Sequence, residues 1–149
     1  MTIIKHFTAT TYVVHKKKVL LHFHKKLNMW LAVGGHIEDN ELPEEAALRE
    51  IIEESGLVTT LYNPDKQLGV NDVTQLIRPM HILLEDIGDT HKHIDFIYFA
   101  TSESNTLNPQ DGEAANLKWF TSDEIKKIDA PENVKTISLE VLSLLSTSH

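Results

Sequence analysis

The N-terminal part of the chain carries hydrophobic patterns that are typical of β-strands. Residues 8–15 are rich in β-branched and aromatic side chains, and residues 19–24 alternate apolar with polar positions. Three lysines separate these runs, so we predict a hairpin with its turn at the lysines. A shorter apolar run at residues 30–33 predicts another strand, which leads into a pair of glycines. The chain therefore begins as a β-sheet.

Residues 43–55 follow a helical period instead. Pro43 suits a first helical position, acidic residues fill the first turn, and Gly56 stands where helices commonly stop. At roughly 100° per residue, one side of this helix is apolar and is expected to face the core. That apolar side consists of Ala47, Leu48, Ile51 and Ile52.

The second half of the chain adds further strands and two helices. Strand patterns occur at residues 58–62, 75–84, 93–102 and 116–120. Ser122 is predicted to cap a short helix over residues 123–127. Pro131 begins a last helix, whose apolar stripe consists of Val134, Ile137, Val141, Leu142 and Leu145. This order of elements predicts an α/β fold, with a mixed sheet sandwiched between helices.

Composition and charge limit the class of protein. A chain of 149 residues is long enough for one core, and no repeat or linker divides residues 1–149 into separate domains. The absence of cysteine excludes disulfides and thiolate metal sites. A net charge of −8 argues against nucleic acid as the main partner. We find no secretory pattern and no apolar run near the roughly 20 residues of a membrane span, so we expect a cytoplasmic protein.

The polar side of the predicted central helix carries Glu50, Glu53 and Glu54. Neighbours at these spacings lie about 5–6 Å apart, where like charges repel each other. Arg49 can relieve part of the repulsion, because Glu45 and Glu53 lie four residues on either side of it. Most acidic helix faces are simply solvated. The alternative is a hard divalent cation such as Mg²⁺, which prefers carboxylate oxygens and is often shared with substrate phosphates.

A longer motif favours the cation. Residues 35–57 read GHIEDNELPEEAALREIIEESGL and match G-x5-E-x7-R-E-U-x-E-E-x-G-U, with U aliphatic, at every fixed position. This motif resembles the Nudix box, the signature of the Nudix hydrolases. The resemblance implies the Nudix α/β/α fold over nearly the whole chain. It also implies Mg²⁺-dependent hydrolysis of a pyrophosphate bond in a nucleoside diphosphate linked to another group, with Mn²⁺ able to substitute.

The resemblance assigns the metal site residue by residue. Glu53 and Glu54 match the two metal-binding glutamates of the box, and Glu50 matches a third glutamate that is either a ligand or the general base. Gly34, just before the box, matches a residue whose carbonyl oxygen can bind the metal. All four positions are therefore candidate metal ligands, and the three glutamates are candidate catalytic residues.

The remaining roles also follow from the resemblance. Arg49 matches the arginine that orients the glutamates, and Glu41 is expected to pair with it. Gly35 shapes the loop before the helix and is a candidate substrate contact. In some relatives the general base is a glutamate on a later loop, and Glu113, six residues before a tryptophan, is the candidate here. Glu113 could equally be an acidic loop residue with no catalytic role.

Several aromatic and polar residues are candidates for substrate binding. Trp30 could stack on a nucleobase or pack in the core, and His93 lies near a sheet end where a substrate could sit. Asp95 could be a buried strand acid or a hydrogen-bond partner of the substrate. Two pairs of histidines each share a strand face, where they could bind a metal or lie at the surface, namely His22 with His24 and His91 with His93.

Three functions are compatible with parts of this pattern. The first is a hydrolase of a small nucleotide derivative, and the resemblance also allows a homodimer. The second is a non-catalytic Nudix-like domain that binds or senses a nucleotide, but such domains usually lose box glutamates that this chain keeps. The third is isomerisation of an isoprenoid diphosphate, which uses a cysteine in relatives and is therefore disfavoured.

Overall fold

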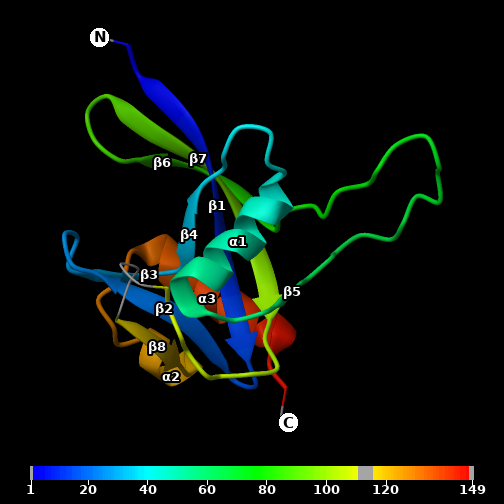
Figure 1. The fold of residues 1–149 in the computed structure, drawn as a ribbon. Coiled ribbons are helices and arrows are strands. Elements are labelled where there is room, and N and C mark those ends of the chain that lie inside the picture. Colours follow the sequence, from blue (N-terminus) through cyan, green and yellow to red (C-terminus); the bar gives the residue numbers. More distant parts are fainter. Residues whose placement is uncertain (1, 111–115, 148–149) are drawn as a thin grey trace.

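The structure is a computed structural model that describes residues 2–110 and 116–147. Its strands and helices are labelled in Figure 1 in the order in which they follow along the chain. The strands are β1 (Ile4–His15), β2 (Lys18–His24), β3 (Met29–Leu31), β4 (Val33–His36), β5 (Thr60–Leu61), β6 (His81–Asp86), β7 (His91–Thr101) and β8 (Leu117–Phe120). The helices are α1 (Pro43–Ser55), α2 (Ser122–Ile125) and α3 (Glu132–Leu145).

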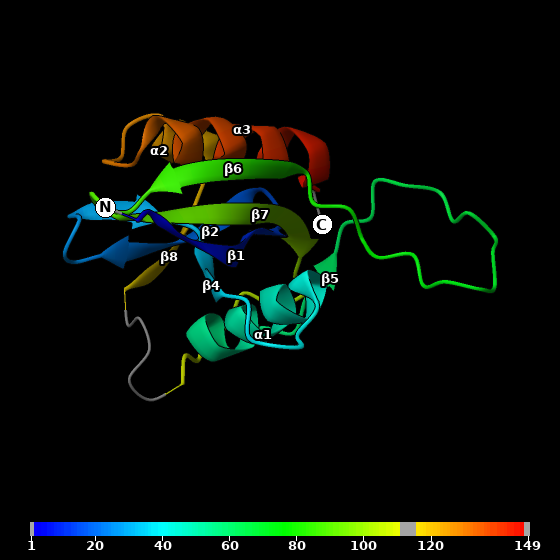
Figure 2. The ribbon, with the colours of Figure 1, turned by 90° about the horizontal axis from the view of Figure 1, so that it is seen from above.

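The long strand β1 is the centre of a mixed sheet. It pairs antiparallel with β2 and β4 and parallel with β7. Strand β7 also pairs antiparallel with β5 and β6, and β2 also pairs antiparallel with β3 and β8. Helix α1 covers one face of the sheet, and α2 and α3 cover the other (Figure 2). This is the predicted mixed sheet between helices.

Alternation along β1 builds a core on each face of the sheet. Tyr12 and Val14 point toward α3, where they join the buried residues of that helix and Phe99. Val13 points the opposite way and joins the apolar face of α1. Most of the predicted stripe of α3 is buried in this way, and Leu145 is partly buried against it.

The hairpin and the central helix were predicted correctly. The hairpin turn places Lys16 at a positive φ of 56°, and α1 has the predicted ends with Gly56 in the left-handed region at φ 77°. The predicted apolar face of α1 was partly wrong, because Ile52 is 44% exposed while Ala46 is fully buried. The strand predicted at residues 30–33 is two short strands, β3 on β2 and β4 on β1.

The second half shows other differences. Only Thr60–Leu61 of the predicted strand at 58–62 pairs with β7, and the strand predicted from residue 75 begins at His81. Between them the chain forms a long loop that projects from the body (Figure 1). The cap of α2 is Thr121 instead of Ser122, because the Thr121 side chain accepts a hydrogen bond from the Glu124 amide. None of the helices described has the length and apolar character needed to cross a membrane.

Candidate active site

Helix α1 presents its glutamates beside the double glycine of β4. Glu54 is only 8% exposed, and its Oε2 accepts a hydrogen bond from the Gly34 backbone N–H at 2.7 Å. A Cβ on Gly35 would overlap the carboxylate of Glu50, which would then have to move, and a Cβ on Gly34 would overlap the backbone of β1. The two glycines therefore let the strand and the acidic side of the helix meet directly.

Arg49 connects the loop before α1 with the glutamates of the helix. Its Nε and Nη2 donate to the two carboxylate oxygens of Glu41 at 2.7 and 3.0 Å, which is the predicted pairing. Its Nη1 donates to Glu50 at 2.9 Å and to Glu53 at 3.2 Å. The same guanidinium reaches the backbone carbonyl of His36 at 3.0 Å. One cation thus orients three acids and the end of β4.

These contacts shift the pKa values of Glu41 and Arg49. The hydrogen bond from Arg49 holds the pKa of Glu41 below its usual range, and the hydrogen bond to Glu41 raises the pKa of Arg49. Glu45 is not a partner of Arg49, contrary to the prediction, because its carboxylate accepts the Leu42 N–H in a capping box at the start of α1. The Glu41–Arg49 pair is therefore charged at neutral pH.

The donor set of Glu50, Glu53 and Glu54 fits a hard divalent cation by its chemistry. All the ligand atoms are carboxylate oxygens on one helix, which is what Mg²⁺ prefers. The three carboxylates do not converge as a group within 4.8 Å in the described chain. Arg49 and the Gly34 amide hold them instead. A cation would therefore have to draw these side chains together.

A cavity of about 800 Å³ opens beside Glu54. Glu54 lines it together with Gly34, Gly35 and His36 of β4 and with residues of β1 and β7. Its other side chains include Thr8, Thr10, Tyr12, His22, His24, Leu31, Glu85, His93, Asp95 and Ile97. The cavity is thus large enough for a small organic ligand and joins the acidic helix to a polar floor.

The floor of the cavity contains a pair of carboxyl groups. Asp95 is 3% exposed and accepts hydrogen bonds from the hydroxyls of Thr8 and Thr10, each at 2.9 Å. Glu85 shares a further hydrogen bond with it. Burial raises the pKa of Glu85 to about 8, and the charge of Asp95 adds to the shift. Burial also raises the pKa of Asp95, against the Thr10 and Thr8 hydrogen bonds that lower it.

This pair makes stability depend on pH. Because the folded-state pKa of Glu85 is about 8 and its ordinary value is 4.5, its stabilising contribution is complete below about pH 4.5 and is lost as the pH rises through about 8. We therefore expect the free energy of unfolding to fall over this range, and the fall to be smaller in Glu85→Gln. Urea denaturation of the unchanged protein and of Glu85→Gln at about pH 5, 7 and 9 tests this. An equal fall of unfolding free energy with pH in the two proteins would contradict it.

Only some of the predicted substrate contacts that the structure describes line the large cavity. Gly35 and His93 line the cavity. The Trp30 ring packs against Phe23 and Phe120 instead, with ring centroids 5.3 and 4.8 Å apart, and is not among the cavity residues. Its role as a substrate contact stays a prediction that its position does not support. Glu113 lies outside the described residues.

His93 has a lowered pKa that follows from its surroundings. Burial is the main cause, and the neighbouring His36, His91 and His6 lower it further. Burial likewise lowers the pKa of His22, with His24 as the second cause. His22 and His93 are therefore biased toward the neutral form, which can donate and accept hydrogen bonds.

The carboxyl pair and its threonines were largely missed from the sequence. Asp95 was an open candidate, but Glu85, Thr8 and Thr10 were not considered. Thr8 and Thr10 stand two apart in β1, so they share a face, and they are polar within a strand that is otherwise largely buried. That local signal could have identified them, whereas the partner Glu85 depends on the pairing of β6 with β7.

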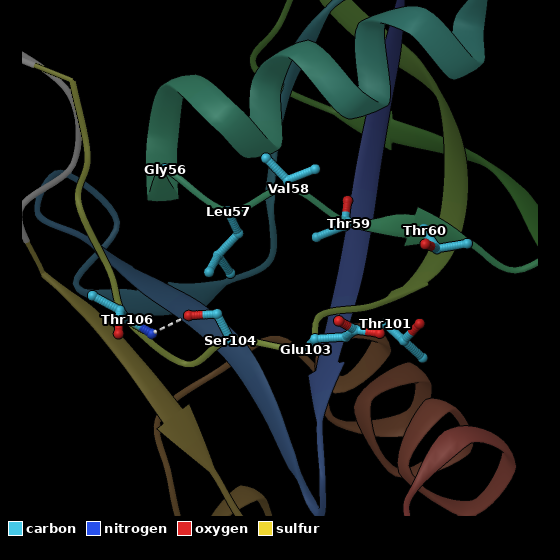
Figure 3. A pocket seen from close by; sticks show the side chains of 9 residues that line it. All are labelled: Gly56, Leu57, Val58, Thr59, Thr60, Thr101, Glu103, Ser104 and Thr106. Carbon is cyan, nitrogen blue, oxygen red and sulfur yellow. Dashed lines mark hydrogen bonds between the residues drawn. The ribbon is translucent and has the colours of Figure 1, made fainter.

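A second cavity, of about 560 Å³, lies beyond the C-terminal end of α1 (Figure 3). Its lining is mainly small and hydroxyl-bearing, and Glu103 is its titratable side chain. It contains none of the helix glutamates, Arg49 or the carboxyl pair. The acidic and basic residues described above therefore lie outside this second cavity.

Known proteins resemble this chain over most of its length. The family model for the NUDIX domain matches residues 5–140. The chain is 28% identical over 120 residues to the oxidized purine nucleoside triphosphate hydrolase of Mus musculus, covering 78% of this chain and 67% of that protein.

Solved structures show the same fold. A hydrolase of the NUDIX family from Clostridium perfringens superposes with a TM-score of 0.86 at 42% identity, covering 97% of this chain and 100% of that one. The NUDIX domain of Shewanella oneidensis NrtR, solved with ADP ribose, has a TM-score of 0.69 at 15% identity. This match covers 96% of this chain and 90% of that one. The second likeness shows the fold alone. From the family match and the intact box motif, we conclude that the chain belongs to the Nudix hydrolase family.

Proposed function

We propose that this protein is a Mg²⁺-dependent hydrolase of a pyrophosphate bond in a nucleoside diphosphate linked to another group. Nudix hydrolases generally act on nucleoside diphosphate derivatives, and the present chain keeps the acidic residues of the box. The observation that carries the proposal is the position of Glu54, which the Gly34 amide holds at the wall of the large cavity.

Charge explains why a cation is needed. The chain carries −8 formally and a diphosphate is also anionic, so the two repel each other. Glu50, Glu53, Glu54 and the Gly34 carbonyl would hold Mg²⁺, with Mn²⁺ able to replace it. Such an ion would offset the negative charge of the diphosphate and would make a bound water more acidic.

The chain's own residues contribute positioning and proton transfer. Arg49 fixes Glu50 and Glu53 through hydrogen bonds of 2.9 and 3.2 Å, so these carboxylates lose little further freedom when the substrate arrives. A carboxylate near the attacked phosphorus accepts the proton of the attacking water. Glu50 and Glu113 are the two proposed bases.

The group beyond the diphosphate would occupy the floor of the cavity. Asp95 and Glu85 present a carboxyl pair that can accept and donate hydrogen bonds, and Tyr12 and His22 add aromatic rings to the walls. A nucleobase offers matching donors and acceptors on a flat ring. The similarity to an oxidized purine nucleoside triphosphate hydrolase makes modified purine triphosphates the first compounds to test.

The alternative is a nucleotide sensor that does not cleave its ligand. The similarity in fold to the NrtR NUDIX domain, solved with ADP ribose, is compatible with it. The retention of Glu50, Glu53 and Glu54 favours the enzyme, because a sensor needs no metal-binding carboxylates. We further infer that residues 1–149 act as one domain, and that its partner is a small molecule and not nucleic acid. A homodimer can be tested by light scattering.

The function is tested by phosphate release from a panel of nucleotide derivatives. The panel contains normal and oxidised purine triphosphates, ADP-ribose and dinucleoside polyphosphates. We expect turnover with Mg²⁺, its complete loss in excess chelator, and recovery when Mg²⁺ or Mn²⁺ is restored. Full activity in excess chelator would contradict the mechanism, and tight binding without turnover of any compound would favour the sensor.

A further inference from the structure

Four histidines gather at the edge of the sheet, outside the acidic network of α1. His6 lies near the start of β1, His36 ends β4, His91 begins β7, and His93 follows two residues later. In the parallel pairing of β1 with β7, His6 is the partner of His93, and in the pairing of β1 with β4, Thr8 is the partner of His36. Residues two apart on a strand point the same way, so the pairing places these imidazoles on one face.

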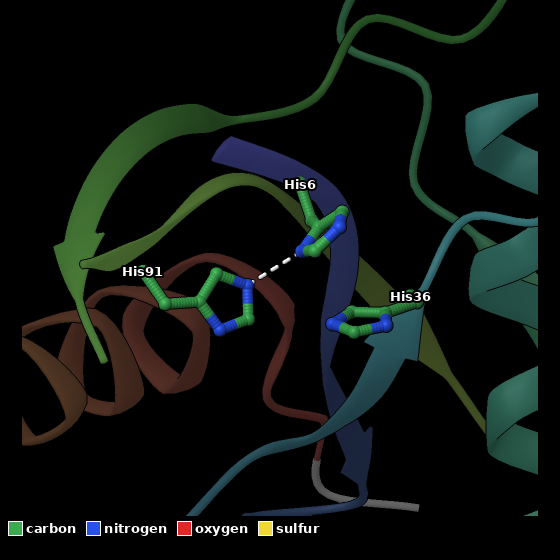
Figure 4. A group of neighbouring side chains, drawn as sticks. All are labelled: His6, His36 and His91. Atoms are coloured by element: carbon green, nitrogen blue, oxygen red, sulfur yellow. Dashed lines mark hydrogen bonds between the residues drawn. The ribbon is translucent and has the colours of Figure 1, made fainter. Parts of the chain in front are cut away.

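We propose that His6, His36 and His91 form a binding site for a borderline divalent metal ion such as Zn²⁺. Figure 4 shows the three rings, which come from three different strands, turned toward one another. One ring nitrogen from each lies within 4.8 Å of those of the other two. They are the one group of potential ligands in the described residues that converges in this way.

The ring nitrogens are close enough for one metal ion to reach all three. His6 Nδ1 lies 2.5 Å from His91 Nε2. Tetrahedral zinc with bonds of about 2.0–2.1 Å separates its ligand nitrogens by roughly 3.3 Å. His6 and His36 are exposed, so small rotations of their side chains reach this spacing. A metal would accept one nitrogen lone pair from each of the three rings.

The donor set selects the class of ion. Three imidazoles offer nitrogen ligands only, which suit Zn²⁺, Co²⁺ or Ni²⁺ and not Mg²⁺. Three histidines also leave a fourth position for water or another ligand. His93 Nε2 lies 3.2 Å from His36 Nε2, so this ring can support the site from the side of the cavity.

This site is separate from the proposed hydrolytic centre but adjoins it. His36 lines the large cavity, and only its backbone carbonyl takes part in the Arg49 network. Changing its side chain therefore leaves that hydrogen bond in place. An ion held by the histidines would add positive charge at the edge of the cavity and would tie the ends of three strands together. Its binding does not depend on whether the chain hydrolyses a nucleotide.

The test is calorimetric titration of the full chain with Zn²⁺ in excess Mg²⁺, which keeps Zn²⁺ from the oxygen ligands of α1. We expect one Zn²⁺ per chain and a rise in Tm that depends on zinc concentration. The variants His6→Ala, His36→Ala and His91→Ala should each weaken Zn²⁺ binding by at least roughly 100-fold. This exceeds the roughly 10–100-fold loss of metal affinity that is typical when a residue hydrogen-bonded to a metal ligand is removed.

Matched variants separate the outcomes. His81→Gln changes another strand histidine, one that pairs with Glu140 outside the cluster, and it should bind Zn²⁺ like the unchanged protein. Glu54→Gln should also bind normally. Absence of one-to-one binding, normal binding by the three cluster variants, or loss of binding in Glu54→Gln would each overturn the proposal. Circular dichroism confirms that each variant is folded.

Discussion

Replacing Glu54 by glutamine is expected to lower kcat by on the order of 10³-fold, the scale on which enzymes lose rate when one preorganised charged contact to the reacting group is removed. Glutamine keeps the size of the side chain, and its amide oxygen can still accept the 2.7 Å hydrogen bond from Gly34 N–H. Only the negative charge beside the cavity is lost. Glu53→Gln should have a similar effect, because both residues match the metal-binding pair of the box.

The matched control is Glu45→Gln on the same helix. Glu45 accepts the Leu42 N–H in the capping box, a contact that glutamine also makes, and it is absent from the cavity lining. Steady-state kinetics at several Mg²⁺ concentrations should show unchanged kcat for Glu45→Gln and loss for Glu54→Gln. Near-normal turnover by Glu54→Gln and Glu53→Gln would remove the assignment of the metal site.

The central helix and its motif were predictable because their signals are local. Pro43, the acidic first turn and Gly56 lie within a few residues of the ends they specify, and the helical period identifies the side that carries the glutamates. The pairing of Arg49 with Glu41 was also predicted, from the resemblance. Ile52 was misplaced because burial depends on where the sheet lies relative to the helix, which periodicity alone does not determine.

The floor of the cavity was not predictable in the same way. Asp95 meets Thr8 and Thr10 across more than 80 residues of sequence, and the contact exists only because β7 pairs parallel with β1. The histidine cluster has the same origin, since its members come from three strands. Parallel pairing of distant strands has no short-range signal, so sequence could nominate these residues without showing which of them meet.

Replacing Arg49 by lysine is expected to lower kcat/KM by on the order of 10²-fold, because an ammonium cannot reproduce the planar fork that orients the acids of the helix. The guanidinium holds both oxygens of Glu41 while also reaching Glu50, Glu53 and the His36 carbonyl. Losing part of this partly buried network should also cost about 1–3 kcal/mol of stability. Thermal unfolding and kinetics measure the two effects separately.

Arg78→Lys is the matched control for Arg49→Lys. Arg78 also makes a bidentate pair, with Asp65 at 3.0–3.3 Å, but its side chain is 58% exposed against 23% for Arg49. Exposed ion pairs are screened by solvent and contribute little, so Arg78→Lys should change neither stability nor kcat/KM appreciably. If Arg49→Lys kept normal kcat/KM, the geometry of the glutamates would not depend on the guanidinium, and their positioning would have to come from the cation and the glycine backbone alone.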